Sequence, residues 1–123
     1  MPVYQAEVIA CPQLPTTLPT LDELIGTDNL DQNNVAEHVL GLTRSGLASG
    51  HVYTLHAELE GMKLMPVFEQ LLRGWKEMGL ALASLGRYFE ELPNTNLPRH
   101  DVVTGEVPGR SGTLCLQGGE FLA

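Results

Sequence analysis

Strand-type runs alternate with helical segments through the middle of this chain, and that order constrains the fold more than any other feature. Val52–Leu55 is a run of strand-forming residues. After Pro66, which suits the first turn of a helix, apolar residues recur at helical spacing as far as Met78. Leu80–Ser84 is an apolar run of strand length, and residues 85–92 form a last helical turn. This β-α-β-α order predicts an α/β fold with a parallel sheet.

Shorter elements are predicted before residue 50. Prolines at positions 12, 15 and 19 exclude a central strand, although residues 13–18 suit an extended piece at a sheet edge. Thr20 is placed to cap a helical turn over Leu21–Ile25. Asp31 is placed to cap a second helix, in which apolar residues recur at helical spacing from Val35 to Leu42.

The C-terminal segment differs from the rest in composition. From Pro93 onward prolines and glycines dominate, so we predict a loop-rich tail over residues 93–123. Residues 1–92 then form the body of the domain, and the tail is an extension of it. A chain of 123 residues with 43% hydrophobic content suits one domain with a modest core.

Charge and cysteine content exclude several classes of partner. Seven basic and fifteen acidic residues give a formal charge of −8, which repels nucleic acid. Cys11 and Cys115 form no Cys-x-x-Cys pair, so we expect free thiols in a reducing compartment. The N-terminus lacks a signal-peptide pattern, and no apolar run reaches the roughly 18 residues of a membrane span. We expect a cytoplasmic protein that is at most peripheral to the inner membrane.

His56 is the candidate catalytic residue. It follows the predicted strand Val52–Leu55, at a position where α/β enzymes often place functional side chains. Histidine is the usual proton carrier near neutral pH, although a histidine at a strand end can equally be structural. Glu58 lies two residues further, on the same face if the strand persists, where it would orient a histidine or contact a substrate amine. A solvated loop carboxylate is the alternative for Glu58.

Several segments together resemble the polysaccharide deacetylase (NodB-homology) family. They are Gln13–Thr20, Val52–Glu58, Phe68–Leu72, Leu85-Gly86 and Val107–Gly112. The similarity runs from about Gln13 to Gln117 and corresponds to the C-terminal part of such an enzyme. His56, with Thr-Leu before it and Ala-Glu after it, is the most specific match.

The resemblance implies a fold and an activity. Family members form an irregular (β/α) barrel, and this chain would supply its C-terminal portion. They are metal-dependent amide hydrolases, for which we expect a divalent metal, zinc, in the intact enzyme. By resemblance the chain belongs to an enzyme that deformylates or deacetylates an amino sugar on undecaprenyl phosphate, as in lipid A aminoarabinose modification. His56 matches the general acid that protonates the leaving amine.

The family's other catalytic groups have no match in this sequence. The base, the metal-binding aspartate and the histidine pair belong to an N-terminal half that we expect to be missing. His51 and His56 do not replace the pair, because they are an odd number of residues apart and would point to opposite faces of one strand. His38 does not replace the pair either, and His100-Asp101 lies in the proline-rich tail with no ligand partner at metal spacing. We therefore expect no metal ligands or cofactor in this fragment and no activity from it alone.

Other features keep two interpretations each. Arg110, in the segment Gly105–Gly112, would bind the phosphate of a lipid-linked substrate, or the segment is a plain turn. Met62, Leu64, Met65 and Phe68 would touch a polyprenyl chain, or they are core residues. Strands cut from a barrel expose edges, so we also expect self-association. The alternative for the whole chain is a small non-catalytic α/β binding or interaction module.

Overall fold

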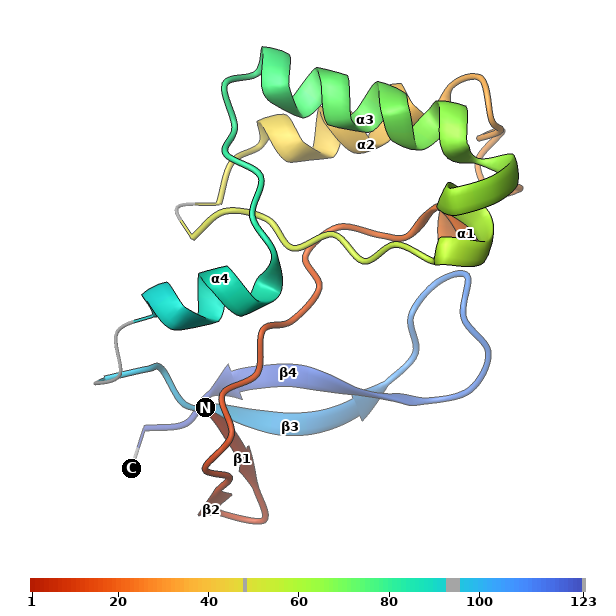
Figure 1. Cartoon of the computed structure of the whole chain (residues 1–123). Coiled ribbons are helices and arrows are strands. Elements are labelled where there is room, and N and C mark those ends of the chain that lie inside the picture. Colours follow the sequence, from red (N-terminus) through yellow and green to blue (C-terminus); the bar gives the residue numbers. More distant parts are fainter. Residues whose placement is uncertain (48, 93–95, 123) are drawn as a thin grey trace. The chain divides into compact units, whose positions relative to one another are not determined.

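The computed structural model describes residues 1–47, 49–92 and 96–122, which divide into two compact units. The helical unit is Thr16–Leu82, and the sheet unit combines residues 1–15 with the chain from Ala83 onward. Figure 1 shows α1, α2 and α3 in the helical unit and the four labelled strands in the sheet unit. The structure is thus mixed α/β with an open four-stranded sheet, which confirms the predicted class at that level.

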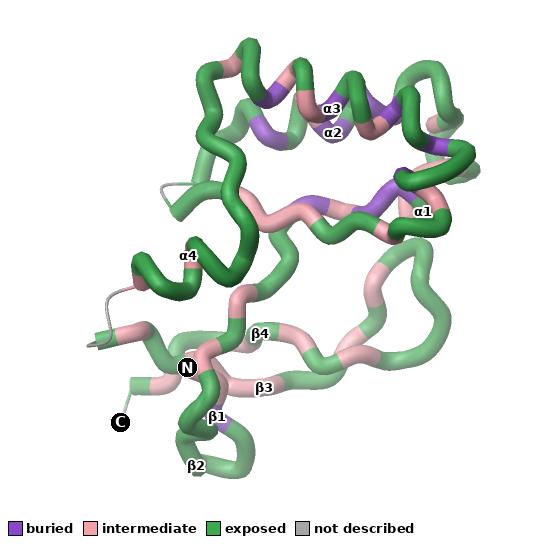
Figure 2. Tube along the Cα trace, viewed as in Figure 1, coloured by how far each residue is buried: buried purple, intermediate pink, exposed green. Residues whose placement is uncertain are grey.

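The helical unit holds the main hydrophobic core. Its helices are α1 (Leu21–Leu24), α2 (Val35–Arg44), the π-helical turn η1 (Leu59–Lys63) and α3 (Met65–Glu77). The apolar faces of α2 and α3 meet, and Figure 2 shows buried residues concentrated along both helices. The buried core residues are Leu18, Leu21, Val35, Ala36, Val39, Leu64, Val67, Leu71 and Trp75.

The third helix follows its predicted pattern closely. Pro66 lies in the first turn of α3, where a missing N–H costs no hydrogen bond, and the helix stops before Gly79, whose φ is +75°. Trp75 inserts into the core and donates its indole N–H to Thr43 Oγ1 of α2 over 3.0 Å. Helix α3 is therefore fixed to α2 by apolar packing and by one buried polar contact.

The sheet unit is assembled from both ends of the chain. It contains β1 (Pro2–Tyr4), β2 (Glu7–Val8), α4 (Leu85–Glu91), β3 (His100–Gly105) and β4 (Leu114–Glu120). The strand order is β2-β1-β3-β4, with β1 parallel to β3 and the outer pairs antiparallel. Helix α4 begins after Ser84, whose hydroxyl accepts a hydrogen bond from the N–H of Arg87 over 3.3 Å.

The predicted strand over Val52–Leu55 is wrong, and so is its place in a parallel sheet. The segment is extended and lies beside Thr16–Leu18, but no ladder forms. The N–H groups of Thr17 and Leu18 both donate to Val52 O, over 3.0 and 3.2 Å. Pro15 and Pro19 flank this short piece and have no N–H to continue the pairing.

The predicted strand over Leu80–Ser84 is also wrong. The segment is exposed and has no strand partner among the residues that the structure describes. Alanine, at two of these five positions, is depleted in strands, and an apolar run alone does not make a strand without a pairing partner. In the part of the chain that the structure describes, no β-α-β-α order is present, and the one parallel pair, β1 with β3, joins strands that were not predicted.

The predicted loop-rich tail is wrong as well. Residues 100–105 and 114–120 form an antiparallel hairpin. Pro108, Gly109 and Gly112 lie in the loop that joins its strands, whereas Gly105, Gly118 and Gly119 lie within the strands. Val102, Val103 and Thr104 are β-branched residues that favour this pairing. The predicted boundary between residues 92 and 93 adjoins residues 93–95, which lie outside the described residues. This division of the chain therefore stays a prediction.

Three smaller predictions are answered by the structure. Helix α2 begins at Val35 and not beside Asp31, whose carboxylate accepts a hydrogen bond from the N–H of Asn33 in the preceding turn. Cys11 and Cys115 are exposed free thiols. In the described residues, no helix has both the length and the apolar character that crossing a bilayer requires.

Candidate functional site

The segment before His56 is held in place by threonines of the proline-rich segment. Val52 N–H donates to Thr17 Oγ1 over 2.7 Å, and the hydroxyls of Thr16 and Thr54 lie 3.1 Å apart. His51 Nδ1 lies 3.3 Å from Thr17 Oγ1. These contacts bring residues 51–56 next to the start of α1, although the two segments are far apart in sequence.

His56 lies where this extended segment turns into a helix. Ala57 and Glu58 are helical, and the π-helical turn η1 follows directly. The carbonyl oxygen of His56 accepts hydrogen bonds from the N–H groups of Leu59 and Glu60, both over 2.9 Å. Within η1, Met62 has non-helical main-chain angles (φ −131°, ψ −106°), so the turn contains a kink before α3. His56 thus ends an extended segment, as predicted, but the segment is not a strand.

The ring of His56 faces a carboxylate that the sequence analysis did not single out. His56 Nδ1 lies 3.4 Å from Asp22 Oδ1 of α1, a distance within ion-pair range but without hydrogen-bond geometry. The side chains are 30% and 45% exposed. A histidine with a carboxylate at Nδ1 keeps its other ring nitrogen for a second partner, which is the arrangement of a proton donor or acceptor.

Glu60 lies on the inner side of the same turn and is 1% exposed. Its Oε1 accepts a hydrogen bond from the hydroxyl of Tyr53, and its Oε2 accepts one from the N–H of His56, both over 2.9 Å. Burial, followed by the hydrogen bond to Glu60 and the charges of Glu60 and Asp22, raises the pKa of Tyr53 far above its ordinary value. The Tyr53 phenol therefore stays protonated and donates its hydrogen to the carboxylate.

The other predicted site residues lie elsewhere. Glu58 is exposed on the first helical turn after His56, so the two residues do not share a strand face, and the predicted contact of Glu58 with a histidine or a substrate amine stays a prediction. Arg110 is exposed in the loop between β3 and β4, where its N–H donates to Val107 O over 3.0 Å in a turn. Glu58 and His56 lie in the helical unit, whereas Arg110 lies in the sheet unit.

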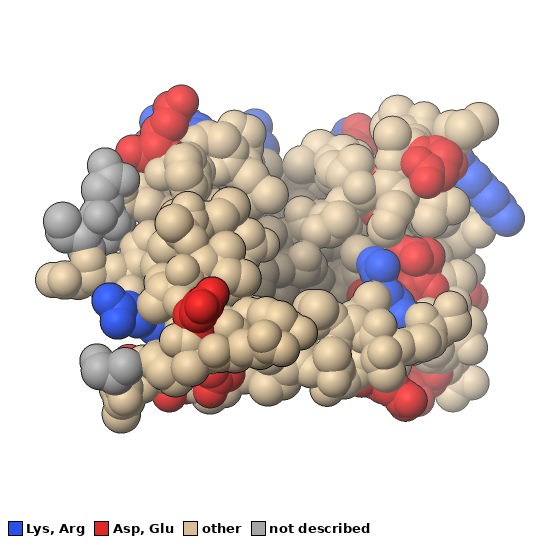
Figure 3. Space-filling view, turned by 90° about the horizontal axis from the view of Figure 1, so that it is seen from below, with Lys and Arg blue, Asp and Glu red and all other residues tan. Residues whose placement is uncertain are grey.

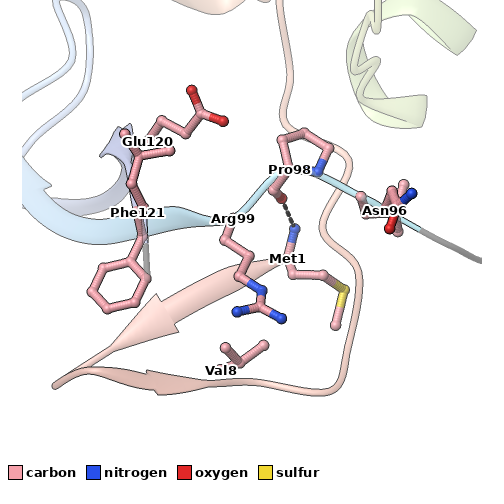
Figure 4. Close-up of a pocket in the computed structure, with 9 residues that line it drawn as sticks. Met1, Val8, Asn96, Pro98, Arg99, Glu120 and Phe121 are labelled. Carbon is pink, nitrogen blue, oxygen red and sulfur yellow. Dashed lines mark hydrogen bonds between the residues drawn. The ribbon is translucent and has the colours of Figure 1, made fainter.

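A hollow in the sheet unit contains none of the predicted residues. Met1, Val8, Arg99 and Phe121 are among the residues that line it, and Figure 4 shows the Arg99 side chain reaching over Val8. The terminal ammonium of Met1 donates to Pro98 O over 2.6 Å.

On the face drawn in Figure 3, acidic and basic side chains lie as separate spots among uncharged residues.

The donor groups of the described residues do not match a metal site. Throughout residues 1–47, 49–92 and 96–122, no three histidine, cysteine, aspartate or glutamate side chains are grouped so that they could hold a metal ion. His56 and Asp22 form a pair only, and Glu60 uses both oxygens for hydrogen bonds. A divalent metal fits poorly with these residues alone.

Comparison with known proteins reveals a partial relationship. The chain is 36% identical over 116 residues to a probable 4-deoxy-4-formamido-L-arabinose-phosphoundecaprenol deformylase, ArnD, of Shewanella sediminis. It is homologous to part of ArnD. The probable ArnD of Wigglesworthia glossinidia brevipalpis is 32% identical over 107 residues. The matches take in 94% and 85% of this chain. No protein-family model matches it.

The homology covers only a portion of ArnD. The chain spans 37% and 36% of the length of these two relatives, so it corresponds to a portion of a deacetylase-type domain. The predicted resemblance to the polysaccharide deacetylase family is thereby confirmed, because ArnD is a member of that family.

Sequence reasoning missed Asp22, Tyr53 and Glu60. Asp22 lies in a Thr-x-x-Glu capping pattern, in which the N–H of Thr20 donates to the Glu23 carboxylate over 2.9 Å, so it was read only as part of a helix start. Glu60 stands four residues after His56, a spacing that brings side chains together only once a helical turn is assumed there.

Proposed function

We propose that this chain is the C-terminal portion of an ArnD-type amide hydrolase, whose barrel and catalytic groups are completed by the remaining part of such a domain. The intact enzyme would remove the formyl group, or alternatively an acetyl group, from an amino sugar carried on undecaprenyl phosphate. Homology to two probable deformylases supports the reaction class. The contact between His56 and Asp22 supports the role of this portion within it.

Hydrolysis of an amide requires that the departing nitrogen receive a proton. His56 would deliver that proton from Nε2, while Asp22, 3.4 Å from Nδ1, keeps the ring in one orientation. The side chain is partly exposed at 30%, so a substrate can reach it. No step through a metal is assigned to the residues of this chain, and the family's metal would depend on ligands from outside it.

The proposal extends to the substrate and to the chain's partners. Arg110, on the loop between β3 and β4, would bind the substrate phosphate, and the exposed Glu58 would contact the sugar amine. The lipid-linked substrate would bring the enzyme to the inner membrane surface from the cytoplasmic side. Alone, the chain would be inactive and would associate with itself through exposed apolar residues.

The proposal is tested with a chimera in which this chain replaces the matching segment of Shewanella sediminis ArnD. Release of formate from the formamido sugar lipid is measured. We expect the chimera to be active, and His56→Ala to lower turnover about 100-fold or more with bound metal unchanged, as loss of a general acid does. His38→Ala, which removes an exposed histidine of α2, is the matched control.

Two results would contradict the proposal. A folded, metal-loaded chimera without hydrolysis would refute the function, and unchanged turnover in His56→Ala would refute the role of His56. Asp22→Asn tests the orientation of the His56 ring separately from proton transfer by that ring. The substitution leaves His56 in place and removes only the charge of the Asp22 carboxylate. We expect its turnover to fall between those of the unmodified chimera and His56→Ala.

A further inference from the structure

Glu60 occupies a position that its charge does not explain. A glutamate is rarely buried completely, because removing a carboxylate from water is costly unless its oxygens are hydrogen-bonded. Glu60 is 1% exposed, and its two oxygens accept one hydrogen bond each, from Tyr53 and from the main chain of His56. Both bonds fall on the segment that carries His56.

The main chain of His56 is bonded to Glu60 in both directions. Its N–H donates to Glu60 Oε2 and its carbonyl accepts from the N–H of Glu60, each over 2.9 Å. Both polar main-chain groups of His56 thus bond to Glu60, and the carbonyl also accepts a hydrogen bond from the N–H of Leu59. Such a reciprocal pair fixes the direction of the Cα–Cβ bond of His56, from which the ring extends toward Asp22.

Tyr53 binds the other oxygen of the Glu60 carboxylate. Its ring packs edge-on against Trp75, with centroids 5.4 Å apart and planes at 61°, so the phenol is anchored in the core. Its hydroxyl then holds Glu60 Oε1. A continuous series of contacts therefore runs from the core through Tyr53 and Glu60 to the main chain of His56.

We propose that Glu60 is a positioning residue, which holds the main chain of His56 so that its ring stays beside Asp22. This inference rests on the proposed function of His56. A purely structural role, in which Glu60 only stabilises the turn, differs in one respect. It predicts that loss of Glu60 weakens the fold without changing the relation between the His56 ring and Asp22.

The test is made on this chain by NMR, with amide exchange and the ring protons of His56 as readouts. Glu60→Leu removes both acceptors at similar volume, and Glu60→Gln keeps an amide that can accept from the His56 N–H. We expect exchange of the His56 amide to rise at least 10-fold in Glu60→Leu and to stay near wild type in Glu60→Gln. The amide of Leu71, in the core of α3, should not change.

The effect of Asp22→Asn on the His56 ring distinguishes a positioning role of Glu60 from a purely structural one. Asp22→Asn should shift the ring-proton signals of His56 in the wild type and in Glu60→Gln, and should leave them unmoved in Glu60→Leu, where the ring has left Asp22. The same shift in all three backgrounds would overturn the inference. So would an equal rise in exchange at His56 and Leu71. Glu58→Gln, at an exposed carboxylate two residues earlier, is the matched control and should change neither readout.

Tyr53→Phe provides the test if Glu60→Leu does not fold. It removes one oxygen atom and leaves the ring contact with Trp75, so Glu60 loses one of its two anchors. We expect a several-fold rise in exchange at His56 alone, and no rise would overturn the inference. Because no readout involves turnover, failure here would leave the chimera result on His56 untouched.

Discussion

Tyr53 is the residue whose ionisation links the candidate site to stability. Its pKa is raised in the folded protein, chiefly by burial and then by Glu60, whereas an unfolded tyrosine ionises near pH 10. Below pH ~10 both states keep the proton, and the free energy of unfolding is unaffected by this group. As the pH rises above ~10, the unfolded state loses the proton and the folded state does not, so stability falls.

This prediction is measured in a variant in which the other two of the three tyrosines, Tyr4 and Tyr88, are phenylalanine. The remaining phenol should give no phenolate absorbance at pH 10 to 11 while the protein stays folded. Its signal should appear only together with unfolding, as followed by circular dichroism. Ordinary titration near pH 10 in the folded protein would contradict the burial of Tyr53.

The candidate site was predictable from the sequence only in part. His56 was identified because it ends a run of strand-forming residues, a signal carried by its neighbours. Asp22 reaches it only because Thr16–Leu18 lies beside Val52, a contact between distant segments that no local pattern encodes. Glu60 was not singled out, since a buried carboxylate cannot be distinguished from an exposed one without its partners.

Among the elements, α2 and α3 offer a paired glycine test. A Cβ at Gly74 of α3 would lie 2.4 Å from Leu40 Cδ1, whereas one at Gly41 of α2 would have nothing within 4 Å. Alanine gains about 1 kcal/mol of helix propensity over glycine at either position. The methyl groups of Leu40 must move to admit a Cβ at Gly74, which offsets part of this gain, so Gly74→Ala should stabilise less than Gly41→Ala in urea unfolding. Equal stabilisation by both would show that Leu40 moves without cost.

The hydrogen bond between α2 and α3 gives a second test at this scale. Thr43→Val removes the acceptor of the buried Trp75 indole N–H and should cost about 1 to 3 kcal/mol. Thr43→Ser keeps the hydroxyl and should cost less, about the value of one buried methyl group. Fluorescence of Trp75, the single tryptophan, follows unfolding in both variants. Equal losses would assign the effect to packing.

Helices were predicted more successfully than strands, for a physical reason. A helix makes its hydrogen bonds within one continuous segment, so the sequence of that segment alone can indicate it. This is why the sequence predicted α3 and α4. A strand depends on a partner elsewhere in the chain. β1 and β2 turn through Gln5 and Ala6, whose φ angles are +50° and +64°, and neither residue is a usual signal for such a turn.

At the scale of the whole molecule, exposed leucines predict association. Leu80 and Leu82 are 44% and 51% exposed in the segment that follows α3, at the end of the helical unit. We expect sedimentation velocity to show association that grows with concentration. Leu80→Lys with Leu82→Lys should weaken it, whereas Leu122→Lys, at a leucine that is 86% exposed, is the control. A monomer at all concentrations would contradict this prediction.

The parallel pairing of β1 with β3 has a consequence for synthesis on the ribosome. The ammonium of Met1 and the carbonyl of Pro98 meet across 97 positions, whereas Thr43 and Trp75 are separated by only 32. Distant contacts form later, so the helical unit should be structured while β1 still has no neighbour on its β3 side. A nascent chain halted before β3 would therefore display a native helical core together with an open β1 edge, which chaperones recognise.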